Sequence, residues 1–372
     1  MIQRILSRQI ADDISRGKVQ LVLGARQVGK TTMMQAMVND RQKTLMLNCD
    51  NYDDRAAITD KTSTELNNLF SGYDSIFIDE AQRVPDIGLT LKMIGDLHLG
   101  RQVLVTGSSS LDLANSINEP ATGRVLEYRM FPLSLRELSN DTSEREEGRL
   151  LEQRMIYGLY PEVVTTPSDA KRLLTSISDN YLYKDLLSYK GIKKPDLIQK
   201  LVRALALQIG EEVSYNELAQ LLGVDKETVE SYIGLLEKCF VVFRLDSFSR
   251  NLRNEIKKGK KIYFWDNGIR NAVLSNFAPL ELRNDTGELW ENLMVSERLK
   301  RNAYACNYAQ PYFWRTHDQH EIDLIEEVDG RLSAFEFKLK PGKKIKCPNS
   351  FRENYPDAKF EVITPENFWG FV

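Results

Sequence analysis

The pattern of hydrophobic and polar positions along the chain predicts a mixed α/β protein. In the first third, short apolar-rich runs at 19–23, 76–78 and 103–105 are typical of buried parallel strands. Farther on, apolar residues recur at helical spacing through 229–240, and 287–301 has the pattern of an amphipathic helix. Polar and apolar residues then alternate in HEIDLI (320–325) and AFEFKL (334–339), which predicts two strands. The acidic turn EEVDGR joins them as a hairpin.

A glycine-rich loop follows the first of these strands. Its residues Gly24, Gly29, Lys30 and Thr31 fit the phosphate-binding pattern G-x-x-x-x-G-K-[ST], and a helix is predicted to follow. The glycines let backbone amides turn toward phosphates, and the helix adds its positive N-terminus. Lys30 would reach the β- and γ-phosphates of ATP, and Thr31 would offer a hydroxyl to Mg²⁺. The predicted nucleotide-binding residues of this loop are Gly24, Ala25, Arg26, Gln27, Val28, Gly29, Lys30, Thr31 and Thr32.

An acidic pair ends the second buried strand, in YDSIFIDEAQ. Asp79 is expected to hold the magnesium through water, and Glu80 to polarise the attacking water as general base. The plain alternative is an exposed strand end. The third strand, QVLVTGSSS, ends in polar residues where open α/β sheets place ligand contacts, so Ser108 is a candidate nucleotide contact. Ordinary turn chemistry is the alternative there.

Four blocks of sequence together resemble one widespread family. GARQVGKT, SIFIDEAQRVP, LVTGSSS and TGRVLEYRMFPLSLREL (122–138) are similar to bacterial and archaeal AAA+ ATPases that carry a C-terminal domain of unknown function. The resemblance covers essentially the whole chain. It implies ATP and Mg²⁺ as ligands, Ser108 as a γ-phosphate sensor, and Arg124 as an arginine finger or sensor for its own or a neighbouring subunit. The last role implies a homo-oligomer. Its alternative is an arginine that braces the following strand.

Four domains are expected. They are a P-loop ATPase domain at 1–140, a helical linker at 141–195, a winged-helix-like module at 196–262 and a restriction-endonuclease-like α/β domain at 263–372. The first boundary depends on SNDTSEREEGRL (139–150), which is polar and lacks apolar periodicity. The winged-helix prediction depends on two short helices joined at Gly223, with capping residues Ser214 and Asp225, and on the strand after them.

DNA contact is expected through the wing of this module rather than through its second helix. That helix exposes Glu227 and Glu230 beside Lys226 and Ser231, and carboxylates repel phosphate. The segment NLRNEIKKGKK (251–261) carries five cations against one anion, and KLKPGKKIK (338–346) carries five against none. Such runs contact phosphates without reading sequence. The alternatives are a solvated face and a packing module that never touches DNA.

The C-terminal hairpin brings candidate metal ligands together. Carboxylate-x-lysine occurs four times, at Asp169/Lys171, Glu255/Lys257, Glu336/Lys338 and Asp357/Lys359, and only Glu336/Lys338 has an acidic partner strand. Asp323 and Glu336 would hold Mg²⁺ or Mn²⁺, and Lys338 would position or deprotonate water. Glu288 or Glu291, on the preceding helix, matches the additional acid of the restriction-endonuclease-like fold. A decayed site and a solvated sheet face are the alternatives.

Composition excludes several classes of protein. Of 372 residues, 42% are hydrophobic and 28% charged, which is typical of globular domains, and the net charge of −3 disfavours a nucleic-acid coating protein. No apolar run approaches the roughly 18 residues of a membrane span, and the start lacks the apolar block of a signal peptide. A cytoplasmic protein without membrane contact is therefore expected. Three histidines and four scattered cysteines argue against structural zinc.

The sequence thus predicts an ATP-hydrolysing AAA+ protein that acts on DNA, as a motor on branched or duplex DNA or by gating a nuclease. Two other classes stay open. One is a nucleotide-dependent regulatory switch that acts on a protein partner. The other is a defence-type effector nuclease gated by ATP.

Overall fold

The computed structural model describes residues 1–13, 17–38, 43–97, 100–108, 123–182, 195–249, 259–316, 320–340 and 345–372. They form two compact units. The first comprises Met1–Leu133 and Lys238–Phe240, and the second comprises Ser134–Glu237 and Val241–Val372. Within the described residues, no helix combines the length and the apolar character needed to cross a membrane.

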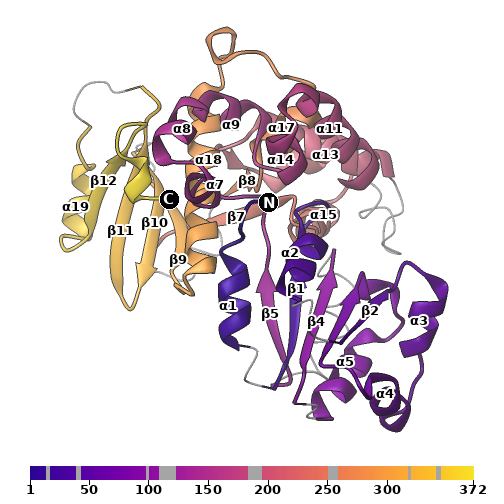
Figure 1. Cartoon of the computed structure of the whole chain (residues 1–372). Coiled ribbons are helices and arrows are strands. Elements are labelled where there is room, and N and C mark those ends of the chain that lie inside the picture. The colour runs from indigo at the N-terminus through magenta and orange to yellow at the C-terminus, as the bar shows by residue number, and fades with distance from the viewer. Residues whose placement is uncertain are drawn as a thin grey trace. The chain divides into compact units, whose positions relative to one another are not determined.

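The first unit is built on a five-stranded sheet in the order β2-β3-β4-β1-β5, whose strands all run in the same direction (Figure 1). All five residues of β1 and of β3 are buried, as the continuous apolar runs predict. The strands are β1 (Val19–Leu23), β2 (Thr44–Asn48), β3 (Ser75–Asp79), β4 (Gln102–Gly107) and β5 (Val125–Arg129). The helices are α1 (Leu6–Asp13), α2 (Lys30–Met37), α3 (Tyr52–Ile58), α4 (Ser63–Phe70), α5 (Ile87–Asp96) and the 3₁₀ turn η2 (Ala81–Arg83).

The second unit begins with short helices where the sequence predicted a polar break. Most of residues 139–150 fall in α7 (Leu135–Asp141) and α8 (Glu144–Arg149). Side chains at the helix starts explain this, because Ser134 and Glu137 form a capping box on α7 and Ser143 caps α8. Further helices are α9 (Leu151–Tyr157), α10 (Pro161–Thr165), α11 (Ala170–Ser176), α13 (Pro195–Leu207), α14 (Tyr215–Leu222), α15 (Lys226–Lys238), α17 (Asn267–Leu274), α18 (Thr286–Tyr304) and α19 (Asn349–Asn354).

The helix pair α14–α15 forms where it was predicted. Ser214 accepts a hydrogen bond from the Glu217 amide, Gly223 ends α14 in the left-handed conformation, and Asp225 accepts from the Thr228 amide at the start of α15. The hairpin β7 (Val242–Ser247) and β8 (Lys260–Phe264) follows, and β8 also pairs with β6 (Glu212–Val213).

One sheet joins the two modules expected in this unit. Its order is β12-β11-β10-β9-β7-β8-β6, with β9 (Gln310–Arg315), β10 (Glu321–Val328), β11 (Arg331–Phe337) and β12 (Lys359–Ile363). The expected boundary between residues 262 and 263 falls inside β8. The predicted hairpin β10–β11 is present and antiparallel, and its turn residues Asp329 and Gly330 have φ values of 49° and 77°.

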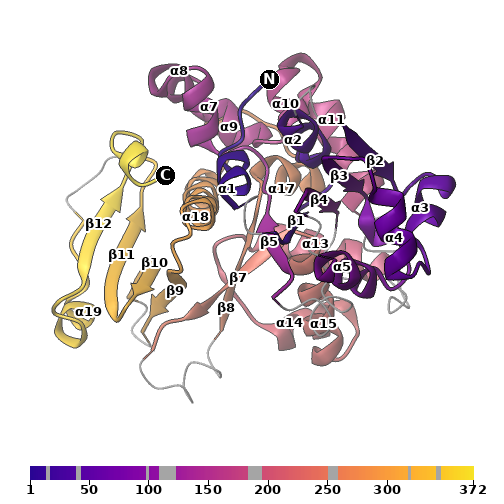
Figure 2. The same ribbon diagram turned by 60° about the horizontal axis from the view of Figure 1, so that its bottom comes forward.

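The long helix α18 packs against β8 and β11 and contributes Leu289, Trp290, Leu293 and Met294 to the core (Figure 2). Asn292 fixes its position, since its buried side chain accepts from the Phe264 amide at 2.8 Å and donates to the Phe264 carbonyl at 2.9 Å. These two hydrogen bonds bring the residues next to Phe264 on β8 close to the residues next to Asn292 on α18. This arrangement positions Glu291 beside β8.

Candidate functional site

The predicted phosphate-binding loop lies between β1 and α2 in the first unit. Gln27 and Gly29 have positive φ values of 61° and 93°, so the loop turns sharply before α2 begins at Lys30. Gly24 is required for another reason. A Cβ atom there would lie 2.1 Å from the carbonyl oxygen of Met130, because β5 passes close to the loop.

Lys30 and a distant arginine brace this loop. The Lys30 ammonium donates to the carbonyls of Gly24 at 2.9 Å and Ala25 at 2.8 Å. The buried Arg4 guanidinium donates to the carbonyls of Val28 at 2.5 Å and Phe131 at 2.7 Å. Arg4 was not among the sequence candidates, since a single arginine near the N-terminus has no motif that would identify it.

Thr31 and Asp79 meet as the motifs predict. The Thr31 hydroxyl donates to Asp79 Oδ2 at 2.9 Å, and the Thr106 hydroxyl also donates to the Asp79 carboxylate. Hydroxyl and carboxylate oxygens are the ligands that Mg²⁺ prefers. The donor set at the end of β3 therefore fits a magnesium ion, and Thr31 and Asp79 are the residues that could hold one.

Glu80 adopts a left-handed conformation (φ 53°, ψ 42°), which is uncommon for a residue with a Cβ atom. Its carboxylate accepts a hydrogen bond from the side-chain amide of Gln82. The same amide donates to the Ser108 hydroxyl at 2.8 Å, and the Ser108 backbone N–H donates to Gln82 Oε1 at 3.2 Å. Gln82 thus connects the predicted base to the predicted sensor. Sequence reasoning missed it, although its place two residues after Glu80 could have indicated it.

We expect Gln82→Leu to lower the kcat of ATP hydrolysis by about tenfold and to change KM little, because the Glu80 carboxylate would lose its link to Ser108. Steady-state kinetics would measure both constants. Gln220→Leu, an exposed glutamine on α14 in the other unit, is the control for the loss of an amide. An unchanged kcat for Gln82→Leu would mean that the link does not position the carboxylate.

The structure corrects the expected role of Arg124 toward its own nucleotide. Val19 pairs with Val125 and Leu23 pairs with Arg129, so Arg124 lies where β5 begins, whereas the loop follows the far end of β1. Five residues of strand separate the two ends by roughly 16 Å. Arg124 instead forms an ion pair with Asp96, and its carbonyl accepts a hydrogen bond from the Val19 amide at 3.0 Å. A role toward a neighbouring subunit stays a prediction.

In the second unit, the predicted acids Glu291, Asp323 and Glu336 lie close to the predicted Lys338, and two further residues, Lys261 and Glu321, join them. These six residues are called the C-terminal cluster. Lys261, on β8 and only 1% exposed, forms ion pairs with Glu291 (Nζ to Oε1, 3.1 Å) and with Glu321. The Tyr263 hydroxyl donates to Glu291 at 2.6 Å. Lys338 pairs with Glu336 at 2.7 Å. Asp323 accepts from the Phe337 amide at 2.8 Å.

Burial and like charges shift the acids of this cluster. Burial, with the neighbouring Glu291 and Glu336 carboxylates, raises the pKa of Asp323 well above its usual range. Burial also raises the pKa of Glu336, although Lys338 opposes the shift. For Lys261, burial lowers the pKa, but the carboxylates of Glu291, Asp323 and Glu321 outweigh it and the net pKa is raised.

The hairpin is more buried than the alternation of its residues predicted. Ile322, Asp323, Leu324, Ile325 and Glu326 are all buried, because β10 is an inner strand, and its pairing with β9 shifts register between Ile322 and Ile325. A solvated sheet face therefore does not describe Asp323, which is 7% exposed. Nevertheless, across the described ranges no three His, Cys, Asp or Glu side chains are grouped as metal ligands. The acids that would hold the predicted second metal are paired with protein groups instead, Glu291 with Lys261, Glu336 with Lys338 and Asp323 with the Phe337 amide, so as arranged they do not fit it.

The expectation that the basic run 251–261 contacts phosphates is also corrected in part. Lys261 is buried in the cluster and is not an open phosphate contact, whereas Lys260 is partly exposed and pairs with Asp246 at 3.4 Å. Arg253, Lys257 and Lys258 lie outside the described residues. On α15, Lys226, Glu227, Glu230 and Ser231 are exposed as predicted.

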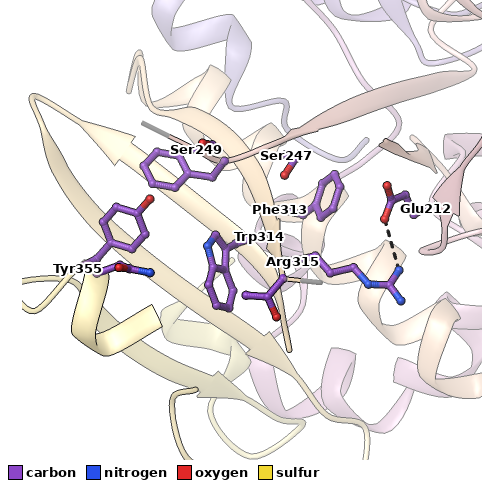
Figure 3. Close-up of a pocket in the computed structure, with 10 residues that line it drawn as sticks. Glu212, Ser247, Ser249, Phe313, Trp314, Arg315 and Tyr355 are labelled. Atoms are coloured by element: carbon purple, nitrogen blue, oxygen red, sulfur yellow. Dashed lines mark hydrogen bonds and ion pairs between the residues drawn. The ribbon is translucent and has the colours of Figure 1, made fainter. Parts of the chain in front are cut away.

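A pocket lies beside the cluster, between the end of β7, β9 and α19 (Figure 3). The side chains of Phe313, Trp314 and Tyr355 contribute aromatic rings to it. Arg315 connects the pocket to the cluster, since its guanidinium pairs with Glu212 at 3.4 Å and with Glu321 at 3.7 Å. The remaining lining residues are Ser247, Phe248, Ser249, Thr316 and Asn354.

Family models match three segments of the chain. Residues 16–139 match the model described as an AAA domain. Residues 148–280 and 286–367 match two domains of unknown function, DUF8612 and DUF4143. The chain therefore contains an AAA-type ATPase domain, as the motifs predicted, followed by segments whose families have no assigned activity.

Three relatives that match most of the chain are uncharacterized proteins. Those of Mycobacterium bovis and Mycobacterium tuberculosis are 28% identical over 331 residues, which is 87% of this chain and 71% of theirs. One from Methanocaldococcus jannaschii is 23% identical over 97% of this chain and 84% of its own. Among solved structures, the Walker-type ATPase of Pyrococcus abyssi is 14% identical and matches 74% of this chain and 96% of its own with a TM-score of 0.49.

Proposed function

We propose that this protein hydrolyses ATP at the loop between β1 and α2 and couples the hydrolysis to contact with DNA. The observation that carries the first part is the convergence of Thr31, Asp79 and Glu80 at the end of that loop. Bound magnesium would neutralise charge on the β- and γ-phosphates. Thr31 and Asp79 would hold it.

The remaining roles fall to groups of the first unit. The loop amides and the N-terminus of α2 bind the phosphates. Lys30 is close enough to exchange its two carbonyl partners for phosphate oxygens. Glu80 takes the proton of the attacking water, and Gln82 holds its carboxylate toward Ser108. Ser108 would then contact the γ-phosphate.

The second part of the proposal concerns the other unit. The pair α14–α15 with the hairpin β7–β8 is interpreted as a winged helix, and α18 with β9–β12 as a restriction-endonuclease-like fold. Glu227 and Glu230 on the exposed face of α15 disfavour base reading, so we propose contact with the DNA backbone through the basic residues after β7. The ring of Tyr355, which is partly exposed and lines the pocket with Arg315, is a group that can stack on unpaired bases.

One experiment tests the coupling. The rate of ATP hydrolysis is measured with no nucleic acid and with single-stranded, duplex or branched DNA. Stimulation by one of these supports the proposal. Hydrolysis that is unaffected by all of them contradicts the DNA part and favours a regulatory switch that acts on a protein partner. Absence of any hydrolysis contradicts the first part.

We expect Lys257→Ala with Lys258→Ala to weaken binding to all DNA sequences alike. The slope of log affinity against log salt should also become shallower by roughly 0.9 for each phosphate of the duplex that the variant no longer neutralises. Fluorescence anisotropy over a salt series measures both quantities. The matched control replaces Lys200 and Lys359, exposed lysines on α13 and β12, by alanine. An equal slope for both double variants would remove this segment as the DNA-binding surface.

A further inference from the structure

The C-terminal cluster contains a cation of its own. Lys261 projects from β8 into the space bounded by α18 and β10, and its side chain is as buried as the apolar core. Its ammonium contacts Glu291 on α18 and Glu321 on β10, and it lies 5.7 Å from the centre of the Phe313 ring. A buried lysine persists only where carboxylates compensate for its lost hydration. Here they do.

We propose that Lys261 is the resident cation of this cluster and occupies the position that a divalent metal would need, so that the cluster is metal-independent. Its role is then to tie α18 to β8 and β10 and to shape the surface beside Arg315. Any contact of this domain with DNA would be made without cutting.

The charges of the cluster support this assignment. Lys261, Lys338 and Arg315 are three cations, and each lies within ion-pairing distance of a carboxylate of the cluster. The paired carboxylates are Glu291, Glu321 and Glu336. Asp323, the fourth acid, accepts a hydrogen bond from the Phe337 amide instead. A divalent ion would therefore lie beside the buried ammonium of Lys261, a like charge, unless Lys261 moved out.

The acids that would have to bind a metal already accept hydrogen bonds from protein groups. Glu291 Oε1, the acid of α18, accepts from both Lys261 and Tyr263. Asp323 Oδ2 accepts from the backbone of β11. A metal would have to share both carboxylates with these donors, because one carboxylate alone binds a hard cation weakly.

The test uses the full chain without nucleotide and follows free Mn²⁺ by its electron paramagnetic resonance. The Mn²⁺ concentration is about 1 mM, which is enough to occupy even a weak site for a hard cation. At this concentration, the wild-type protein and Asp323→Asn should bind the same amount of Mn²⁺. Lys261→Met should gain about one Mn²⁺ per chain, and Lys261→Met combined with Asp323→Asn should lose it again. Lys260→Met changes the adjacent lysine on β8, which pairs with Asp246, and should gain none.

A thermal measurement gives a second readout. Mn²⁺ should raise the Tm of Lys261→Met, because the ion replaces the missing cation, and should leave the Tm of the wild type unchanged. Asp323-dependent Mn²⁺ binding or DNA cutting by the wild type would overturn the proposal. So would a folded Lys261→Met protein that gains no Mn²⁺ site. If Lys261→Met does not fold, the comparison of wild type with Asp323→Asn decides alone. None of these results bears on ATP hydrolysis, which is measured separately in the other unit.

Discussion

Replacing Glu80 by glutamine should leave ATP binding intact and slow its hydrolysis by roughly 10²-fold or more, the usual contribution of a positioned general base. Glutamine keeps the size of the side chain but cannot take a proton from water. The backbone N–H of residue 80 donates a hydrogen bond to the Thr106 hydroxyl. This bond does not depend on the carboxylate, so the site should stay assembled. Binding is measured by titration with a fluorescent ATP analogue, and turnover by phosphate release.

Lys30→Ala provides the contrasting variant. It removes the ammonium that would meet the β- and γ-phosphates, so tight ATP binding should be lost as well as hydrolysis. The two variants together separate binding from chemistry. If Glu80→Gln hydrolyses ATP at the wild-type rate, Glu80 is not the base. If Lys30→Ala binds ATP normally, the loop is not the site of the phosphates.

The nucleotide site was predictable because its chemistry depends on short spacing along the chain. The loop, the acidic pair after β3 and Ser108 at the end of β4 lie at the carboxyl ends of neighbouring parallel strands, where such sheets bind ligands. The hairpin β10–β11 was predictable for a similar reason, since alternation and an Asp-Gly turn are local signals. Arg4 was not, because no motif encodes its hydrogen bonds to the loop, and Gln82 had only its place two residues after Glu80 to indicate it.

Other departures from the predictions come from tertiary contacts. The polar stretch 139–150 has no apolar periodicity, but capping side chains and a buried pair between Glu147 and Arg154 stabilise helices there. Lys261 ends a basic run and therefore looked like a surface cation. Its carboxylate partners lie 30 and 60 residues farther along the chain, and they meet Lys261 only because α18 packs against β8 and because β10 belongs to the same sheet as β8.

The largest expected effect on stability belongs to Lys300, a fully buried lysine on α18. It pairs with Glu297 at 2.7 Å, and both side chains are at most 1% exposed. Glu297 also accepts from the Leu135 amide at 2.6 Å, and the Lys300 charge lowers the pKa of the buried Asp266 against the opposing effect of burial. Lys300→Met should destabilise the second unit by about 3–5 kcal/mol, because it leaves buried acids without their cation.

Arg172→Met is the matched control. Arg172 pairs with Asp169 at 2.8 Å with the same i,i+3 spacing, but its side chain is 78% exposed, so its loss should cost at most about 0.5 kcal/mol. Tryptophan fluorescence during urea unfolding reports on this unit alone, since Trp265, Trp290, Trp314 and Trp369 all belong to it. Equal midpoints for the two variants would show that the buried pair contributes no more than the exposed one.

The cost of Lys300→Met should also depend on pH in a defined direction. Burial raises the pKa of Glu297 even with Lys300 present, and without the lysine this pKa should rise further. Below about pH 4 glutamate is protonated in the unfolded chain as well, so the lost cation matters least there. As pH rises, the folded variant must either keep a proton on Glu297 or bury its charge, and the stability difference from wild type should grow toward pH 8. A difference that stays constant or shrinks over this range would show that Glu297 is not the acid that Lys300 neutralises.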